Sequence, residues 1–237
     1  AEKTVGSKTP PPAIAATTKS TDNPRSAVKR GPNAPPDGFT ALFNGKDLTG
    51  WKGLVENPKT RAKMTAEQLA ESQKNADNNM RAHWSVQKGV LVFDGKGQSL
   101  CTVKDYGDFE LYVDWKIEPK GDSGIYLRGS PQVQICDPND GPRHVAGSGG
   151  LYNNKKNSSN PQIRADNPIR QWNTFYIKMV GERVTVRLNG QLVVDNVVFE
   201  NYWEGDKPIY STGAIELQNH GSTLYFRNLF LRAIPRN

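Results

Sequence analysis

The sequence has few histidines, few cysteines and no long apolar run, and each shortage excludes a class of protein. Its 237 residues include three His and two Cys, which do not make a zinc-finger pattern. No apolar run approaches the ~18 residues that a membrane-spanning helix needs, so we expect no membrane insertion. RNP and helix-turn-helix signatures are also missing, which argues against a nucleic-acid-binding protein.

The net charge of +7 is distributed unevenly along the chain. Residues 1–36 carry six Lys or Arg against two acidic residues, which leaves only +3 on the remainder. A nucleic-acid-binding domain concentrates positive charge on its folded part, so we expect no nucleic acid partner. Residues 1–36 are rich in Pro, Lys, Thr and Ala and are expected to form a flexible arm. Residues 37–237 are expected to form one domain.

The compartment and the redox state of the thiols are left partly open. The chain begins with Ala and not Met, and we expect a removed export signal and a periplasmic or extracellular location. In such a compartment Cys101 and Cys136 could form a disulfide, but two buried free thiols fit equally well. The sequence does not indicate the oligomeric state.

Most of the chain after residue 37 reads as short strands. The segment 64–80 is the one convincing helix, with Thr65 and Gln68 as a capping box at its start, and it is expected to lie on the surface near one edge of the β domain. Lys88-Gly89 and Asn189-Gly190 predict tight hairpin turns. The expected strands are residues 38–43, 84–87, 90–93, 99–103, 109–117, 172–180, 183–188, 191–197 and 224–234, together with the two in residues 118–137.

This pattern predicts an all-β fold. Roughly a dozen strands without βαβ alternation imply two packed antiparallel sheets. We therefore expect a jelly-roll sandwich with one short surface helix. A long irregular stretch over residues 138–170 interrupts the strands, and a loop of that length in a compact domain usually has a function or is disordered.

Residues 118–137 read as two strands joined by a tight Gly-Ser-Pro corner, and the rest of the domain is organised around them. Ile125, Leu127, Val133 and Ile135 alternate with the polar side chains of Tyr126, Arg128, Gln132 and Gln134. Alternation with a period of two places the polar group on one face. A face rich in aromatic, cationic and amide groups predicts a groove for a hydroxyl-rich ligand.

A set of motifs, in order along the chain, resembles one known family. They are Phe39-Thr-Ala-Leu-Phe-Asn-Gly-Lys-Asp-Leu-Thr-Gly-Trp51, Tyr106-Gly-Asp-Phe-Glu-Leu111, Asp122-Ser-Gly-Ile-Tyr-Leu-Arg128, Val133-Gln-Ile-Cys-Asp137, Trp172-Asn-Thr174, Leu188-Asn-Gly190, Ile215-Glu-Leu-Gln-Asn-His-Gly221 and Phe226-Arg-Asn228. Residues 38–235 resemble the 3-keto-disaccharide hydrolase domain, formerly the domain of unknown function 1080.

The resemblance implies a concanavalin A-like lectin/glucanase jelly roll in a bacterial, usually exported protein that acts on 3-keto-glycosides. The chain departs from the family pattern at two positions. Gln132 stands where members often have Glu, and Cys136 stands where close relatives often have Trp. If a Glu at the first position were the acid or base, this chain would need another group for that role.

The carboxylates do not fit ordinary glucanase chemistry. Retaining glucanases on this fold use two carboxylates about 5 Å apart, and the usual Glu-x-Asp-x-x-Glu spacing is missing here. A 3-keto sugar needs other groups, because its ketone acidifies the C2 proton. A base can remove that proton, the C1 substituent can leave by β-elimination, and water can then add to the product. Such a site needs a base and an electrophile for the developing enolate.

Four residues are candidates for the catalytic roles. His220 is the best-suited base, because histidine titrates near neutral pH. Arg128 is suited to the enolate because its charge is permanent. Asp114 and Asp122 are alternative bases. The expected substrate-binding residues are Tyr126, Gln132, Gln134, Asp137, Tyr152 and Gln218. His144, on the long loop, could join the site only if that loop folds over it.

Each assignment has a structural alternative. Arg128 could pair with Asp114 or Asp137 across the sheet, and His220 and Asp122 could cap turns. A divalent metal ion on His220 and an Asp is left open, because the spacing shows no ligand signature. The expected partner is a small carbohydrate, which the domain either cleaves or, as a lectin-like module, only binds.

Overall fold

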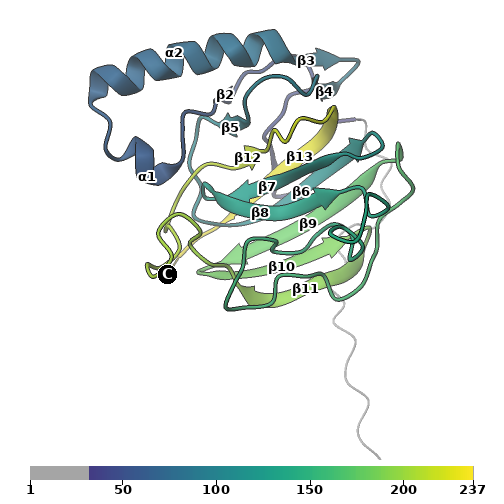
Figure 1. Cartoon of the computed structure of the whole chain (residues 1–237). Helices are drawn as coiled ribbons and strands as arrows, with labels where there is room; N and C mark the ends of the chain where they lie inside the picture. The colour runs from purple at the N-terminus through teal and green to yellow at the C-terminus, as the bar shows by residue number, and fades with distance from the viewer. Residues whose placement is uncertain (1–31, 237) are drawn as a thin grey trace, which may run out of the picture.

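The computed structural model describes residues 32–236, and within that range two antiparallel sheets pack face to face (Figure 1). The larger sheet has eight strands in the order β11-β10-β9-β6-β13-β4-β3, with β1 paired to β13. The smaller has five strands in the order β2-β5-β12-β7-β8. This arrangement confirms the predicted all-β jelly-roll sandwich.

The strands are short at the start of the chain and long in the middle and at the end. They are β1 Thr40–Ala41, β2 Trp51–Gly53, β3 Trp84–Gln87, β4 Val90–Phe93, β5 Leu100–Thr102, β6 Asp108–Ile117, β7 Asp122–Leu127, β8 Ser130–Cys136, β9 Asn173–Val180, β10 Arg183–Leu188, β11 Gln191–Val198, β12 Glu216–Leu217 and β13 Leu224–Ile234. The helices are α1 Pro58–Arg61 and α2 Ala66–His83.

The core lies between the two sheets and follows the predicted alternation. Phe109, Leu111, Val113, Trp115 and Ile117 of β6 are buried on one side. Ile125, Leu127, Val133, Ile135 and Leu217 of the smaller sheet meet them from the other. Successive side chains of a strand point to opposite faces. The residues that alternate with them, such as Tyr126, Gln132, Gln134 and Glu216, therefore point away from the core, to what we call the outer face of the five-stranded sheet.

Helix α2 covers the edge of this outer face. It begins after Thr65, whose side chain and that of Gln68 form the predicted capping box, and it continues three residues beyond the predicted end. It packs on β2, the edge strand, where a Cβ on Gly53 would lie 2.1 Å from the backbone oxygen of Ala76. Glycine at position 53 thus permits the close approach of helix and sheet.

The tight turns are made by residues in the left-handed region. In the first turn, Lys88 has a φ of 51° and Gly89 a φ of 78°. In the second turn, Asn189 has a φ of 52° and Gly190 a φ of 84°. Positive φ at both central positions is typical of the two-residue turn that matches strand twist. Both predicted hairpins are confirmed.

Part of the predicted flexible arm lies outside the described residues. Residues 1–31 belong to that undescribed part, but Asn33 is attached to the sandwich. Its backbone N–H donates to Asn228 Oδ1 at 2.8 Å, and its side chain donates to the Gly89 carbonyl at 2.8 Å. Within residues 32–236 no helix is both long and apolar enough to span a bilayer.

Candidate active site

A hollow of about 210 Å³ opens on the outer face of the five-stranded sheet, over β7 and β8. Its lining contains most of the predicted polar groups, and the long loop and the segment before β12 supply the walls. The lining residues are Asp122, Tyr126, Pro131, Gln132, Gln134, Arg143, Tyr152, Asn153, Tyr202, Trp203, Gln218 and His220.

Asp122, the first residue of β7, holds the polar groups of the hollow together. Its Oδ2 lies 3.1 Å from His220 Nδ1 and 3.8 Å from His144 Nε2. Its Oδ1 accepts a hydrogen bond of 2.9 Å from Gln134 Nε2. A carboxylate on Nδ1 orients the imidazole and leaves Nε2 as the nitrogen that can take a proton. The side chain of His220 is half exposed, so a ligand can reach it.

Gln132 and Gln134 extend this network along β8. Gln132 Nε2 donates to Gln134 Oε1, and both side chains are almost fully buried. Their room comes from Gly124 on the neighbouring strand, where a Cβ would lie 2.8 Å from Gln132 Cδ. Glycine is therefore required at position 124 for the amides to lie flat on the sheet.

Tyr126 and Gln218 form the floor of the hollow next to these two glutamines. Gln218 Nε2 donates to Tyr126 Oη at 3.1 Å. Burial raises the pKa of the Tyr126 phenol, so the phenol stays protonated and its O–H can donate to a ligand. Gln218 Oε1 is buried and has no hydrogen-bond partner among residues 32–236. Buried polar atoms are nearly always paired, so this orphan acceptor indicates a place for a bound hydroxyl.

The long loop of residues 138–170 closes one side of the hollow. It is fixed to β8 by two backbone bonds, from Gln134 N to Gly150 O at 2.9 Å and from Gly149 N to Gln134 O at 2.8 Å. This attachment brings His144, Arg143 and Tyr152 to the site. Arg143 Nε donates to Tyr152 Oη, and the guanidinium carbon lies 5.2 Å from the centroid of that ring.

Arg128 does not face the hollow, and this expectation was wrong. The β7–β8 turn consists of Arg128 and Gly129, with φ of 55° and 74°, and not of the predicted Gly-Ser-Pro corner. The turn takes Arg128 out of the alternation with Tyr126. Its buried guanidinium donates to the carbonyls of Gly107, Gly181 and Tyr210 and pairs with Asp108. Arg128 therefore fastens one end of the sandwich, and Asp108 takes the place of the partners proposed from sequence.

Two further predicted carboxylates lie elsewhere. Asp114 is on β6 between the core residues Val113 and Trp115, so it points to the far side of the eight-stranded sheet, where Asn228 Nδ2 donates to it at 2.7 Å. Asp137 accepts from the backbone N–H groups of Lys120 and Asn139, each at 2.9 Å. Asp114 is thus not available as the base, and Asp137 holds two loop segments and does not line the hollow.

The two cysteines are not candidates for catalysis, and no metal site is found among the described residues. Cys101 and Cys136 are free and buried, and burial raises the pKa of each thiol to about 12. Neither thiol is therefore a nucleophile near neutral pH. In the part of the chain that the structure describes, no group of three or more His, Cys, Asp or Glu side chains is arranged to hold a metal ion. We assign no residue as a metal ligand.

Glu216 is a buried acid that our sequence interpretation missed. It lies on β12, beside Tyr126 in the register, and its side chain is almost fully buried. Burial raises its pKa to about 7. Its Oε1 has no hydrogen-bond partner within the described range. The outer face therefore contains a carboxyl group that is protonated in mildly acidic solution and ionises near neutral pH.

We expect Glu216→Gln to remove a pH dependence of stability. The folded-state pKa lies above the ordinary value of 4.5, so the stability that the protonated acid contributes is complete below pH 4.5 and is lost as the pH rises through about 7. Over that pH range the free energy of unfolding of the wild-type protein should fall by ~3 kcal/mol relative to that of the glutamine variant, at ~1.4 kcal/mol per pKa unit. Urea unfolding at pH 4.5 and pH 8 measures the difference.

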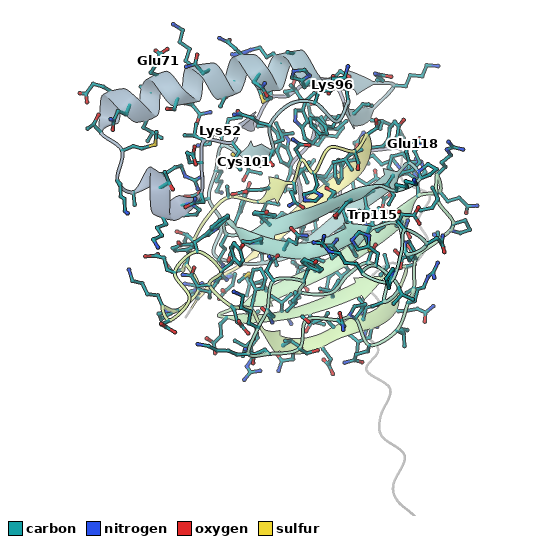
Figure 2. All side chains as sticks on the ribbon, viewed as in Figure 1. Lys52, Glu71, Lys96, Cys101, Trp115 and Glu118 are labelled. Atoms are coloured by element: carbon teal, nitrogen blue, oxygen red, sulfur yellow. The ribbon has the colours of Figure 1, made fainter. Side chains whose placement is uncertain are left out.

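The control for this prediction is Glu71→Gln. Figure 2 shows Glu71 on the side of α2 that faces away from the sheets, so this change should not alter the pH profile. An equal profile for Glu216→Gln and wild type would contradict a raised pKa at Glu216.

Sequence reasoning missed residues that reach the site from loops or from unremarkable positions. They are Arg143, Asn153, Tyr202 and Trp203. No local pattern distinguishes a loop residue that folds over a sheet. Glu216 had a usable signal, because it stands between the apolar residues Ile215 and Leu217 and two positions before Gln218, so alternation places it on the same face as Gln218.

Comparison with known proteins decides the family. The model of the 3-keto-α-glucoside-1,2-lyase-like domain matches residues 38–232. The chain belongs to this family. A 3-keto-disaccharide hydrolase of Bacteroides thetaiotaomicron is 22% identical, with the match covering 84% of this chain and 79% of the relative.

Solved structures agree with the fold of this family member. A crystal structure of a candidate glycosyl hydrolase from Parabacteroides distasonis has a TM-score of 0.66 at 24% identity, covering 86% of this chain and all of the other. A second structure from the same organism covers 94% of this chain and all of the other, with a TM-score of 0.62 at 24% identity. At this identity the likeness supports the sandwich fold alone.

Proposed function

We propose that this protein is an enzyme that cleaves 3-keto-glycosides, including 3-keto-disaccharides, by removing the C2 proton, eliminating the C1 substituent and hydrating the product. The observation that carries the proposal is the Asp122 network. A carboxylate that accepts a hydrogen bond from Gln134 and lies 3.1 Å from His220 Nδ1, at the wall of a sugar-sized hollow, makes His220 an oriented base next to hydroxyl-binding amides. Family membership and the printed name of the Bacteroides relative support the substrate class.

The first half of the reaction assigns His220 as the base. With Nδ1 held by Asp122, its Nε2 takes the C2 proton, and the C–H electrons form the C1=C2 double bond while the C1–O bond breaks. The leaving oxygen takes that proton from His220 and departs as an alcohol. The product is an unsaturated 3-keto sugar. Water then adds its oxygen at C1 and gives up a proton to His220, which passes it to C2, and the free 3-keto sugar results.

The other groups of the hollow bind and polarise the substrate. Arg143 is the cation that lines the hollow, and it takes the role first given to Arg128, the stabilisation of negative charge on the ketone oxygen. The protonated phenol of Tyr126 can donate to a substrate oxygen. Gln132, Gln134, Gln218 and Asn153 supply amides for sugar hydroxyls, and Tyr152, Tyr202 and Trp203 supply ring surfaces.

The test is a comparison of an oxidised substrate with its parent. We expect the protein to release glucose from 3-keto-trehalose and to leave trehalose intact, because only the ketone acidifies C2. Deuterium at C2 should slow the reaction through a primary isotope effect. Saturable binding of 3-keto-trehalose without turnover would contradict the enzyme and support the alternative, a lectin-like module.

A further inference from the structure

A small cavity lies beside the Asp122 hollow, between β8 and the long loop, and we call it the His144 cavity. Its volume is about 20 Å³, and Gln134, Arg143 and Tyr152 line both spaces. The two spaces are therefore direct neighbours. A cavity of this size holds about one water molecule, provided that polar groups surround it. The other polar side chains in its lining are those of His144, Ser159 and Asn160.

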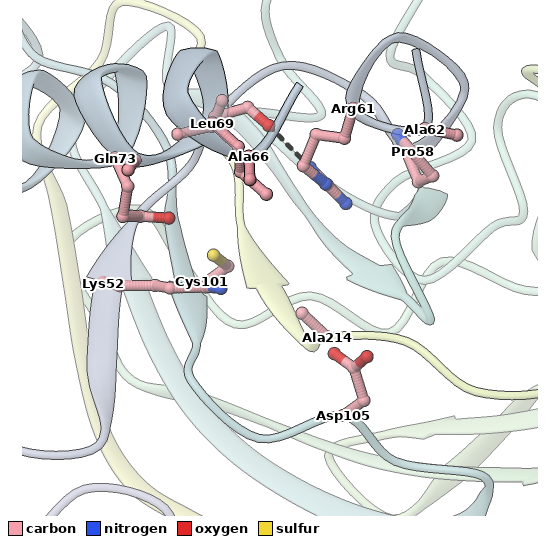
Figure 3. Close-up of a pocket in the computed structure, with 12 residues that line it drawn as sticks. Lys52, Pro58, Arg61, Ala62, Ala66, Leu69, Gln73, Cys101, Asp105 and Ala214 are labelled. Atoms are coloured by element: carbon pink, nitrogen blue, oxygen red, sulfur yellow. Dashed lines mark hydrogen bonds between the residues drawn. The ribbon is translucent and has the colours of Figure 1, made fainter. Parts of the chain in front are cut away.

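A larger hollow under α2 does not adjoin the site in this way (Figure 3). It measures about 710 Å³, and Figure 3 shows it between Leu69 of the helix and Cys101 of the sheet. Of the residues that the structure describes, none lines both this hollow and the one at Asp122. Glu216, on the strand between them, is only 2% exposed. The His144 cavity, and not the larger hollow, is therefore the space that can serve the reaction.

His144 is the buried side chain of this cavity that lacks hydrogen-bond partners. It is 8% exposed, and neither of its ring nitrogens has a partner in the described part of the chain. Nε2 is turned towards Asp122 Oδ2 at 3.8 Å, which is too long for a hydrogen bond. Buried polar atoms nearly always have a partner. The two unpaired nitrogens thus indicate that a small polar molecule binds here.

The backbone around His144 is fixed, so the ring is in place before a ligand binds. Gly147 N donates to the His144 carbonyl at 2.8 Å. The next residue, Ser148, is attached to the sheet, because Cys136 N of β8 donates to its Oγ at 3.0 Å. A preorganised group binds a ligand with a smaller entropic cost of ordering. The loop is therefore built to orient a small molecule at His144.

One carboxylate oxygen connects this cavity with the base. Asp122 Oδ2 lies 3.1 Å from His220 Nδ1 and 3.8 Å from His144 Nε2. A carboxylate beside Nε2 favours the proton on that nitrogen, which leaves Nδ1 of His144 as an acceptor for an O–H group. Removal of the C2 proton by His220 needs no water, whereas hydration needs a water molecule close to C1. His144 is therefore suited to hold the water while His220 transfers protons.

We propose that the His144 cavity binds the water of the hydration step and that His144 positions it. The inference rests on the proposed function and deepens it. The water donates one O–H to His144 until its oxygen bonds to C1. The electrons of the C1=C2 bond then move to C2, and the proton that the water loses passes through His220 to C2. A positioned water reacts faster than bulk water, because the encounter has already been made.

Separate assays of the two half-reactions test this role. In His144→Phe the side chain keeps a ring and loses both nitrogens. Glucose release from 3-keto-trehalose reports elimination, and ¹H NMR follows conversion of the unsaturated 3-keto sugar to the free 3-keto sugar. We expect hydration to fall roughly tenfold or more relative to elimination, so that the unsaturated sugar accumulates. His144→Gln, whose amide oxygen can accept the same hydrogen bond, should restore hydration in part.

Filling the cavity tests the same role without changing the histidine. Ala146 lines the cavity, whereas Val145, which is 63% exposed, does not. Ala146→Leu should exclude the water and slow hydration relative to elimination, as His144→Phe does. Val145→Leu is the matched control and should change neither half-reaction.

Addition of the unsaturated 3-keto sugar itself separates this proposal from the proposed function. If wild type releases no glucose but hydrates the added sugar, and His144→Phe and Ala146→Leu lose that activity, the proposed function fails and the water site stands. If wild type releases glucose but does not hydrate the added sugar, the water site is overturned and elimination stands. An equal loss of both half-reactions in the two variants, or no change in either, would also overturn the water site. If wild type catalyses neither half-reaction, both proposals fail.

Discussion

His220→Ala is expected to lower kcat on a 3-keto-glucoside by roughly 10²–10⁴-fold, the usual contribution of a positioned general base. The physical reason is the contact of 3.1 Å between its Nδ1 and Asp122, which fixes the ring with Nε2 free. Because the side chain is half exposed, its removal leaves no buried cavity, and the urea midpoint should hardly change. Steady-state kinetics on 3-keto-trehalose and urea unfolding measure the two effects separately.

The chain offers a matched control for this variant. His83 also pairs with an aspartate, Asp94, through Nδ1 at 2.9 Å, but it does not line the hollow at Asp122. His83→Ala should therefore leave kcat unchanged. Added imidazole should restore part of the activity of His220→Ala, since a small base can enter the vacated place. If His220→Ala keeps kcat within a factor of three while His144→Ala loses activity, the second histidine on Asp122 is the base instead.

Arg128→Met is expected to destabilise the fold by about 3 kcal/mol or more without a direct effect on chemistry. Arg128 is only 1% exposed. Its guanidinium donates hydrogen bonds to three backbone carbonyls and pairs with Asp108. Removing one partner of a buried ion pair typically costs ~3–5 kcal/mol. Asp108 keeps Arg236, whose hydrogen bonds lower its pKa to about 2, and this remaining partner limits the loss. Urea unfolding measures the change in the free energy of unfolding.

Arg170→Met is the matched control, because Arg170 also has a positive φ, 68°, and also pairs with a carboxylate, Glu118, but on the surface. The urea midpoint of Arg170→Met should therefore move little. The kinetic readout separates structure from catalysis. Below the unfolding transition Arg128→Met should keep the kcat of wild type, and a loss of kcat in fully folded Arg128→Met would return Arg128 to the catalytic group.

The strands and turns could be read from the sequence because their causes are local. Alternation along β6 assigns one face to the core, and Asn189-Gly190 can adopt the positive φ that a two-residue turn needs. The helix cap at Thr65 is likewise a contact between residues three positions apart. The same alternation placed Tyr126, Gln132 and Gln134 on one face, and the structure brings all three to the hollow.

Only the tertiary structure decided which of the remaining polar groups join them. Arg128 continues the sequence alternation, but a turn with positive φ removes it from the strand face and sends its charge to Asp108. His144 and Arg143 reach the site because a long loop pairs with β8, and the pKa of Glu216 depends on what covers it. The sequence by itself thus determined the sheets and one polar face. Long-range packing decided which other polar groups reach the hollow, since contacts between distant segments leave no local pattern.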